Sequence, residues 1–281
     1  MISNSYAKIN LAINIIKRND DGYHEVDMIT SKIKFYDEIE IKINRSKRIN
    51  LSCSNRFISC DAQNLVYQAA HLVMVKYKLN TGLDIAIKKR IPIQAGLGGG
   101  SSNAATTIEM LNKMFNLKMT LEDKVSLGKE LGSDIPLFFY ADVCRIQGYG
   151  EKVTPVKNHL KDISIILVKP NFGLATRDVY QNVNLSTCDH PAIAPLVKAL
   201  GAGDYPSFIK NTANSLQESA LKIKPAISSI MTELYELGID KCLVCGSGST
   251  VVGFTKKPVV AKTIKQYYLK KKFFVFITKM I

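Results

Sequence analysis

The chain has 281 residues, of which 46% are apolar and 22% are charged, and its formal net charge is +14. This length favours two domains, each large enough to bury a core of its own, and the composition excludes a disordered chain. No apolar run approaches the roughly 20 residues that a membrane-spanning helix needs, so we expect no membrane segment.

The first predicted element is a strand over residues 6–17, in which apolar and polar positions alternate. A period of two predicts one buried face and one solvated face, and Lys8, Asn10 and Asn14 fall on the solvated one. Because polar residues interrupt its apolar stretch, the N-terminus does not read as a signal peptide. The expected compartment is therefore the cytoplasm.

A turn is predicted at Asp20-Asp21-Gly22, followed by Tyr23 and His24, and residues 26–43 predict two further strands. Asp61 is predicted to cap the helix that follows, with Asn64 in its first turn as a second capping residue.

Residues 91–111, IPIQAGLGGGSSNAATTIEML, join a predicted strand to a predicted helix through a glycine-rich loop. Ser101 or Ser102 is the expected N-cap. Loop amides and the free N–H groups of a first helical turn create a site for an anion, and phosphate is the expected ligand.

Other glycine motifs fit this loop less well. A Walker A loop needs a lysine that is absent, and the dinucleotide fingerprint needs a glycine where Ser101 stands. The glycine loop of protein kinases leads into a strand, whereas this one leads into a helix. A flexible linker would not be fused to a periodic helix.

Thr120 and Asp123 predict a capping box for a helix that ends at Gly132. Asp134 follows, just before Pro136, and its position alone favours a helix N-cap. Residues 144–153 predict a hairpin that completes a first domain, so we expect domains at residues 1–155 and 156–281.

The second domain is predicted to begin with a buried strand over residues 163–168. Helices are expected over residues 211–223 and 225–237. KCLVCGSGSTVVGF, at residues 241–254, predicts two strands joined by a glycine turn, and a helix and a strand over residues 273–279 end the chain.

The positive charge raises the possibility of a nucleic-acid partner, but the lysines are spread along the chain and suit anionic small molecules equally well. The six cysteines are scattered, which favours reduced thiols. Cys242 and Cys245 form one CxxC pair, which supplies only half of the ligands of a structural zinc site.

Several strings in this sequence resemble the motifs of the GHMP small-molecule kinases, in the order expected for that family. These strings are AKINL at residues 7–11, PIQAGLGGGSSNAA at 92–105, GSDIP at 132–136 and the glycine turn at 246–249. DGYHE at residues 21–25 resembles a motif found in one branch of this family, the kinases that act on a cytidine diphosphate-linked alcohol. The resemblance covers essentially the whole chain, although Gln94 stands where a small residue is frequent.

The resemblance implies a two-domain α+β GHMP kinase fold with the active site in the cleft between the domains. It also implies transfer of the γ-phosphoryl group of ATP, with Mg²⁺, to the 2-hydroxyl of a cytidine diphosphate-linked methylerythritol in non-mevalonate isoprenoid precursor synthesis. The expected partner is this small molecule, with no nucleic acid or membrane, in a monomer or weak homodimer.

The resemblance also implies roles for individual residues. Asp134 is expected to accept the proton of the substrate hydroxyl, while Lys8 holds the developing charge. Cytosine is expected between the rings of Tyr23 and Tyr180, with His24 at its polar edge, although Tyr180 suits a core position equally well. The expected ATP-binding residues are Asn64, Lys89, Pro92, Ala95, Gly96, Leu97, Gly98, Gly99, Gly100, Ser101 and Ser102. The expected substrate-binding residues are Asn10, Tyr23, His24, Asp134, Thr176, Tyr180, Gly246, Ser247 and Gly248.

Three alternatives remain open from the sequence. A sister kinase acting on homoserine or mevalonate would keep the glycine loop without needing DGYH or Tyr180. An NAD-dependent oxidoreductase would bind nicotinamide nucleotides. A basic RNA-binding module would show an affinity that falls steeply with salt.

Overall fold

The computed structural model describes residues 1–19 and 22–281, and the chain divides into two compact units. The first unit comprises residues 1–7, 35–93 and 98–141, and the second comprises residues 8–34, 94–97 and 142–281. Two long strands, β1 (Ile2–Arg18) and β2 (His24–Asn44), contribute residues to both units. The prediction of two strands over residues 26–43 is wrong, because no glycine or proline interrupts this segment and β2 runs through it.

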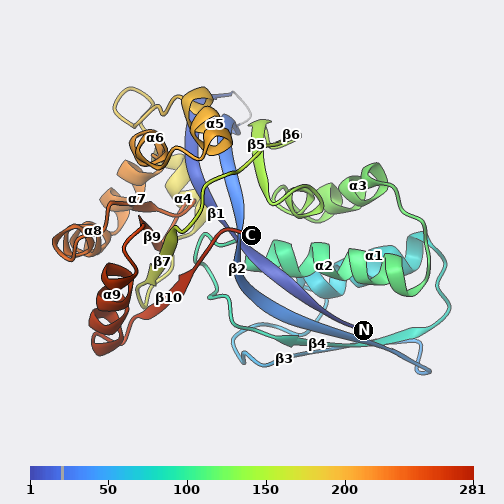
Figure 1. Cartoon of the computed structure of the whole chain (residues 1–281). Helices are drawn as coiled ribbons and strands as arrows, with labels where there is room; N and C mark the ends of the chain where they lie inside the picture. Colours follow the sequence, from blue (N-terminus) through green and yellow to red (C-terminus); the bar gives the residue numbers. More distant parts are fainter. Residues whose placement is uncertain (20–21) are drawn as a thin grey trace. The chain divides into compact units, whose positions relative to one another are not determined.

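In the first unit, helices cover a layer of strands (Figure 1). Its elements are β3 (Ile49–Cys53), α1 (Leu65–Lys76), β4 (Gly82–Lys88), α2 (Gly99–Met114), α3 (Leu121–Leu131) and the short 3₁₀ helix η1 (Pro136–Phe139). β4 pairs antiparallel with β2 and parallel with β3. The predicted strand before the glycine loop and the predicted helix after it are both confirmed.

The core of the first unit follows from alternation along β2 and β4, whose inward side chains meet the apolar faces of α1 and α2. Each such buried aliphatic side chain contributes roughly 1.5 to 3 kcal/mol. The core includes Ile39, Ile41, Leu83, Ile85, Ile87, Val66, Val73, Ala105, Ile108 and Leu111. The predicted capping box of Thr120 and Asp123, which orients α3, is also present.

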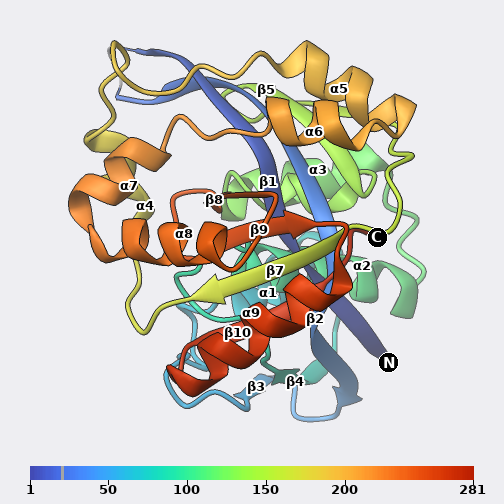
Figure 2. The ribbon, with the colours of Figure 1, turned by 60° about the vertical axis from the view of Figure 1, so that its left-hand side comes forward.

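The second unit contains a four-stranded antiparallel sheet in the order β10-β7-β9-β8, seen side by side in Figure 2. The strands of the unit are β5 (Val143–Gly148), β6 (Lys152–Pro155), β7 (Ser164–Lys169), β8 (Lys241–Val244), β9 (Val251–Thr255) and β10 (Phe274–Thr278). Its helices are α4 (Thr176–Gln181), α5 (Ile193–Ala202), α6 (Tyr205–Asn211), α7 (Gln217–Ile223), α8 (Ala226–Glu236) and α9 (Pro258–Lys270).

Most predicted elements of the second unit are confirmed, including the hairpin of β5 and β6, the buried strand β7 and the two strands around the glycine turn. The prediction of a helix over residues 211–223 is wrong, since α7 begins only at Gln217. Residues 212–216 are not helical: Asn214 forms a parallel bridge with Ile13 of β1, and residues 215–216 form a turn.

Asp20 and Asp21 of the predicted turn lie outside the described residues. Gly22 has a φ of 83°, and the backbone N–H of Asn19 donates to the carbonyl oxygen of Tyr23 at 2.9 Å. Within residues 1–19 and 22–281, no helix combines the length and apolar character needed to cross a bilayer.

Candidate active site

The glycine loop of the first unit ends in a helix start without a side-chain cap. Gly98 is the N-cap of α2 and has a φ of 67°, a left-handed conformation that glycine adopts without strain. The expectation that Ser101 or Ser102 caps this helix is wrong, because Ser102 lies within the first turn, where its hydroxyl accepts a hydrogen bond of 2.7 Å from Ser5. The N–H groups of Gly99, Gly100 and Ser101 lie in this turn before any intrahelical acceptor is available. This arrangement suits a phosphate group.

A buried ion pair lies beside this helix start. Nζ of Lys89 contacts Oδ2 of Asp37, and the two side chains are only 5% and 0% exposed. The other oxygen of Asp37 accepts from the backbone N–H groups of Arg90 and Ile91 at 2.7 and 2.8 Å. A Cβ placed on Gly99 would lie 2.8 Å from Nζ of Lys89. The ammonium predicted to bind ATP is therefore already paired with Asp37, and it places positive charge beside Gly99.

Asn64 is the N-cap of α1, and the expectation that Asp61 caps this helix is wrong. The Asn64 side chain accepts from the N–H of Val66 at 2.9 Å and donates to the carbonyl oxygen of Ser59 at 2.6 Å. Asp61 instead accepts from the N–H of Gln63 within the preceding turn. The adenine contact expected of Asn64 stays a prediction, and its capping bonds leave one amide N–H and one oxygen lone pair available for it.

Asp134 is an exposed carboxylate between α3 and η1. Ile135 is the N-cap of η1, and no side chain forms a capping bond there, so the N-cap interpretation of Asp134 is wrong. Within the part of the chain that the structure describes, Asp134 takes part in no hydrogen bond or ion pair. Its oxygens are therefore available to a ligand.

In the second unit, the polar side of β1 is buried rather than solvated. Lys8 is 7% exposed and Asn10 is 2% exposed, which contradicts the predicted solvated face. Nζ of Lys8 donates to Oδ1 of Asn10 at 2.7 Å, and Nδ2 of Asn10 lies 3.5 Å from the sulfur of Met28. No carboxylate among the described residues pairs with Lys8. A buried cation without a counter-charge is unfavourable unless it meets an anion, so Lys8 is suited to a phosphoryl group.

The glycine turn of residues 246–249 lies against this pair. A Cβ on Gly246 would lie 3.4 Å from Oδ1 of Asn10 and 3.5 Å from Nζ of Lys8. Asn214 holds the turn from behind by donating to the carbonyl oxygens of Val244 and Gly246, both at 2.8 Å. The turn therefore lies within contact distance of the Lys8 ammonium, and Gly246 suits it through its φ of 59°, which glycine adopts without strain.

Hydroxyl groups and a second glycine extend this polar cluster. The hydroxyls of Thr176 and Ser247 lie 2.9 Å apart, and Gly248 has a φ of 90°. Gly248 packs so closely on Leu174 that a Cβ would lie 3.0 Å from the leucine side chain. The structure therefore brings six of the predicted catalytic and substrate-binding residues together in one polar cluster of the second unit. They are Lys8, Asn10, Thr176, Gly246, Ser247 and Gly248.

Residues 94–97 also belong to the second unit. The N–H of Lys8 donates to the carbonyl oxygen of Leu97 at 3.0 Å, and the thiol of Cys245 lies 3.6 Å from the carbonyl oxygen of Gly96. Burial raises the pKa of the Cys245 thiol, which keeps it neutral beside Lys8. Ala95 is buried and Pro92, in the first unit, is half-buried. The ATP contacts expected of these loop residues stay predictions.

Two rings of the predicted cytosine site lie together. The rings of His24 and Tyr180 are 5.3 Å apart with an interplanar angle of 52°. Tyr180 is half-buried against the core, as a core tyrosine would be, whereas Tyr23 is 70% exposed. Partial burial, reinforced by the nearby charge of Arg18, lowers the pKa of His24, so its imidazole stays neutral at physiological pH.

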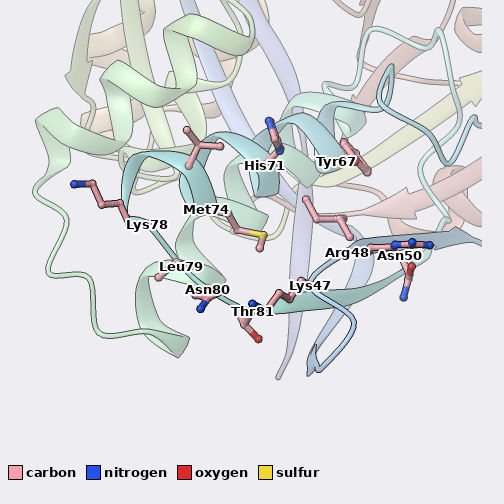
Figure 3. A pocket seen from close by; sticks show the side chains of 12 residues that line it. Lys47, Arg48, Asn50, Tyr67, His71, Met74, Lys78, Leu79, Asn80 and Thr81 are labelled. Carbon is pink, nitrogen blue, oxygen red and sulfur yellow. The ribbon is translucent and has the colours of Figure 1, made fainter.

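A groove of about 670 Å³ lies elsewhere in the first unit, between α1 and the start of β3. None of the predicted site residues lines it. Figure 3 shows that the side chains of Lys78 and Arg48 extend toward opposite ends of the groove. Its cations therefore do not converge on one point, and we do not assign it to the reaction.

Sequence reasoning overlooked two supporting residues: Asp37, which pairs with Lys89 in the first unit, and Asn214, which holds the glycine turn in the second. Asp37 continues the inward series of Phe35 and Ile39 on β2, so its position in the alternation was a readable signal of a buried acid. Asn214 carries no such local signal, because its partners in the glycine turn are distant in sequence.

Comparisons with known proteins give matches in both halves of the chain. Residues 64–142 match the family model "GHMP kinases N terminal domain", and residues 196–273 match "GHMP kinases C terminal". A 4-diphosphocytidyl-2-C-methyl-D-erythritol kinase from Bacillus cytotoxicus is 39% identical over 88% of this chain and 85% of its own length.

Solved structures extend the comparison to the fold. A crystal structure of 4-(cytidine 5'-diphospho)-2C-methyl-D-erythritol kinase superposes with a TM-score of 0.84 at 26% identity, covering 100% of this chain and 99% of the other. A homoserine kinase from Cytophaga hutchinsonii superposes with a TM-score of 0.73 at 14% identity, covering 99% and 98% of the two chains, and shows the fold alone.

Proposed function

The chain belongs to the GHMP kinases, in the family of the 4-diphosphocytidyl-2-C-methyl-D-erythritol kinases, and from this premise we propose its substrate and the roles of its residues. It transfers the γ-phosphoryl group of ATP to the 2-hydroxyl of 4-diphosphocytidyl-2-C-methyl-D-erythritol, in the non-mevalonate route to isoprenoid precursors. The observation that carries the reaction class is the buried ammonium of Lys8, which has no carboxylate partner within the described residues. Phosphoryl transfer is catalysed mainly by positioning and by neutralising charge, so such a cation is the central requirement.

ATP binds through its phosphates to the N–H groups at the start of α2. The uncapped turn after Gly98 supports this role, because its free donors and the helix dipole both favour an anion. Lys89 adds positive charge nearby, and Asn64 approaches the adenine. Residues 92 and 95–97 complete the nucleotide contacts.

Mg²⁺ accompanies the nucleotide. In the part of the chain that the structure describes, no group of three or more His, Cys, Asp or Glu side chains could hold a metal ion. We therefore propose that the ion is held chiefly by phosphate oxygens and water, as Mg²⁺ commonly is. When bound, the ion neutralises phosphate charge, and the chain's own residues supply the remaining steps.

Asp134 accepts the proton of the 2-hydroxyl as that oxygen bonds to the γ-phosphorus, while the bond from the γ-phosphorus to the ADP oxygen breaks. Its free carboxylate supports this role. Lys8 stabilises the negative charge of the transferred group, and Asn10 holds the ammonium through its 2.7 Å hydrogen bond. The hydroxyls of Thr176 and Ser247 and the glycines at 246 and 248 contact the substrate around its acceptor end.

Cytosine binds against the rings of Tyr23 and Tyr180, and the neutral imidazole of His24 contacts its polar edge. Stacking on an aromatic ring contributes roughly 1 to 3 kcal/mol per base. The contact between the His24 and Tyr180 rings supports this assignment. The Tyr23 side chain is 70% exposed, so a bound base can reach its ring from solvent.

The remaining expectations form part of the same proposal. We expect folding domains at residues 1–155 and 156–281, a monomer or weak homodimer, and no nucleic-acid or membrane partner. A cytoplasmic location is supported by the cysteines, because all six are free thiols.

A coupled assay of ADP release tests the proposal. The purified protein is supplied with ATP, Mg²⁺ and one acceptor, either the cytidyl substrate, homoserine or mevalonate. We expect turnover with the cytidyl substrate and only background with the other two. Preferential turnover of homoserine or mevalonate would overturn the substrate assignment and leave the kinase class in place.

A further inference from the structure

The register at the paired ends of β1 and β2 is set by two contacts. The N–H of Asn19 donates to the carbonyl oxygen of Tyr23 at 2.9 Å. Two residues further from the end, Nζ of Lys17 lies 3.4 Å from Oε2 of Glu25. Arg18 and His24 lie between these two pairs, so they are directly opposite each other.

The residue opposite Arg18 is His24. Directly opposed residues of an antiparallel pair point to the same face, so Arg18 and His24 share one face and the neighbouring pair takes the other. The ring of His24 also contacts that of Tyr180, at 5.3 Å between centroids. The charge of Arg18 helps to lower the pKa of His24, which agrees with this adjacency. Arg18 is thus a neighbour of the proposed cytosine platform.

The guanidinium of Arg18 is exposed and forms no ion pair with any residue in the described ranges. The adjacent cation differs, because Lys17 is paired with Glu25 on the other face. The end of β1 is also held by a side chain that follows β5, since Nδ2 of Asn19 donates to the hydroxyl of Tyr149 at 2.5 Å. Among the described residues, Arg18 is therefore a cation without a carboxylate partner, and the strand end that carries it is anchored.

We propose that Arg18 binds the diphosphate of the cytidyl substrate, an assignment that rests on the proposed function. In that substrate the diphosphate is separated from cytosine only by the ribose, so it must pass close to the ring platform. A guanidinium presents paired donors that match phosphate oxygens, and it keeps its charge at every physiological pH. The platform recognises the base, and Arg18 distinguishes a cytidine diphosphate ligand from free cytidine.

Calorimetry with CDP and with cytidine tests this assignment in three proteins: the wild type, Arg18→Gln and Lys17→Gln. For Arg18→Gln we expect the affinity for CDP to fall about tenfold while that for cytidine stays within twofold, as loss of one charge-assisted contact predicts. Lys17→Gln is the matched control and should leave both affinities within twofold. Partial recovery of CDP binding in Arg18→Lys would support a charge contact.

Other outcomes are equally informative. If Arg18→Gln lowers the affinities for CDP and cytidine equally, Arg18 contacts the base. If Arg18→Gln and Lys17→Gln lower the CDP affinity equally, Arg18 acts only through the overall positive charge of this region. Either result, or no loss at all, overturns the proposal while leaving the kinase assignment intact. If the wild type binds neither ligand, the proposed function itself fails.

A second measurement tests the placement of Arg18 independently of any ligand. In an NMR titration of the imidazole protons, Arg18→Gln should raise the pKa of His24, because a nearby cation disfavours the protonated ring. Lys17→Gln should change it less. An unchanged pKa of His24 in Arg18→Gln would contradict the adjacency on which the proposal depends.

Discussion

The ammonium of Lys8 and the amide oxygen of Asn10 are joined by a 2.7 Å hydrogen bond between two buried side chains of the same strand. Residues two apart on a strand point to the same side, so β1 itself presents both groups to the glycine turn. A neutral amide satisfies one donor of the ammonium and leaves its charge uncompensated. The protein thus keeps a buried positive charge that is useful only when an anion arrives.

This arrangement predicts opposite effects of Lys8→Met on activity and stability. The turnover number should fall about 10²- to 10³-fold, the range seen when one charge-stabilising donor is removed. The melting temperature should stay unchanged or rise, because methionine of similar length removes an unpaired buried charge. Kinetics and thermal unfolding of the same preparation measure both quantities.

Lys17→Met serves as the control for Lys8→Met, since Lys17 lies on the same strand with 60% of its side chain exposed. It should leave turnover unchanged. A Lys8→Met protein with near-normal turnover, or one that is strongly destabilised, would contradict the assignment.

Gly100→Val tests the phosphate site at the start of α2. A helical Cβ tilts toward the helix N-terminus, so the new side chain would crowd the N–H groups that are proposed to bind phosphate. The nearest described neighbour of this Cβ would be a methyl of Leu65 at 3.7 Å, so the fold should tolerate the change. We expect calorimetry to show an ATP affinity lower by about tenfold or more.

The control for this change is Gly201→Val in α5, where a Cβ meets nothing within 4 Å. It should leave ATP affinity unchanged. Gly99 is a poorer choice for the test, because its Cβ would press on the Lys89 ammonium. Equal ATP affinities in Gly100→Val and wild type would exclude the proposed placement of the phosphates.

Asp37→Asn should destabilise the first unit strongly. It would leave Lys89 as a buried charge without its partner, and breaking a buried pair in this way costs about 3 to 5 kcal/mol. Denaturant unfolding measures the loss, and the double variant Asp37→Asn with Lys89→Met should recover part of it. Asp84→Asn, at an exposed carboxylate bound by Asn44 and Asn50, is the control and should have little effect. Similar stabilities for the two single variants would refute the role given to Asp37.

Local patterns explain why much of this structure could be predicted from the sequence. Alternation along residues 83–87 and helical periodicity after the glycine loop both reflect burial of one side of an element, which neighbouring residues encode. The capping box of Thr120 and Asp123 is likewise a local interaction. The motifs identified the family, and the family comparison agrees with them.

The errors arose where distant segments decide the outcome. Lys8 and Asn10 are buried because the turn at Gly246 covers them, and nothing in β1 itself signals that contact. The segment before Gln217 is not helical because Asn214 bridges to Ile13, although its sequence suits a helix. Asn64 caps α1 because the helix begins after it, whereas Asp61 lies in the preceding turn. Both residue types are good N-caps, so the sequence alone did not show where the helix begins.

Asp134 offers the sharpest separation between catalysis and structure. A carboxylate that capped a helix would stabilise the fold, and Asn would replace it almost equally well. The structure removes this alternative, since η1 begins at Pro136 without a side-chain cap. Asp134→Asn should therefore leave the melting temperature unchanged, while turnover falls by about 10²- to 10⁴-fold, as expected for loss of a general base.

The kinetic pattern of Asp134→Asn should distinguish proton transfer from substrate binding. Loss of a group that acts only in the transition state lowers kcat and kcat/KM by similar factors, whereas loss of a ground-state contact raises KM at constant kcat. Glu130→Gln, at an exposed acid on α3 of the same unit, is the control and should behave as wild type. A raised KM with normal kcat would make Asp134 a binding residue. Normal values of both constants would leave its exposed carboxylate without a part in the reaction, because the position has no capping bond through which it could act.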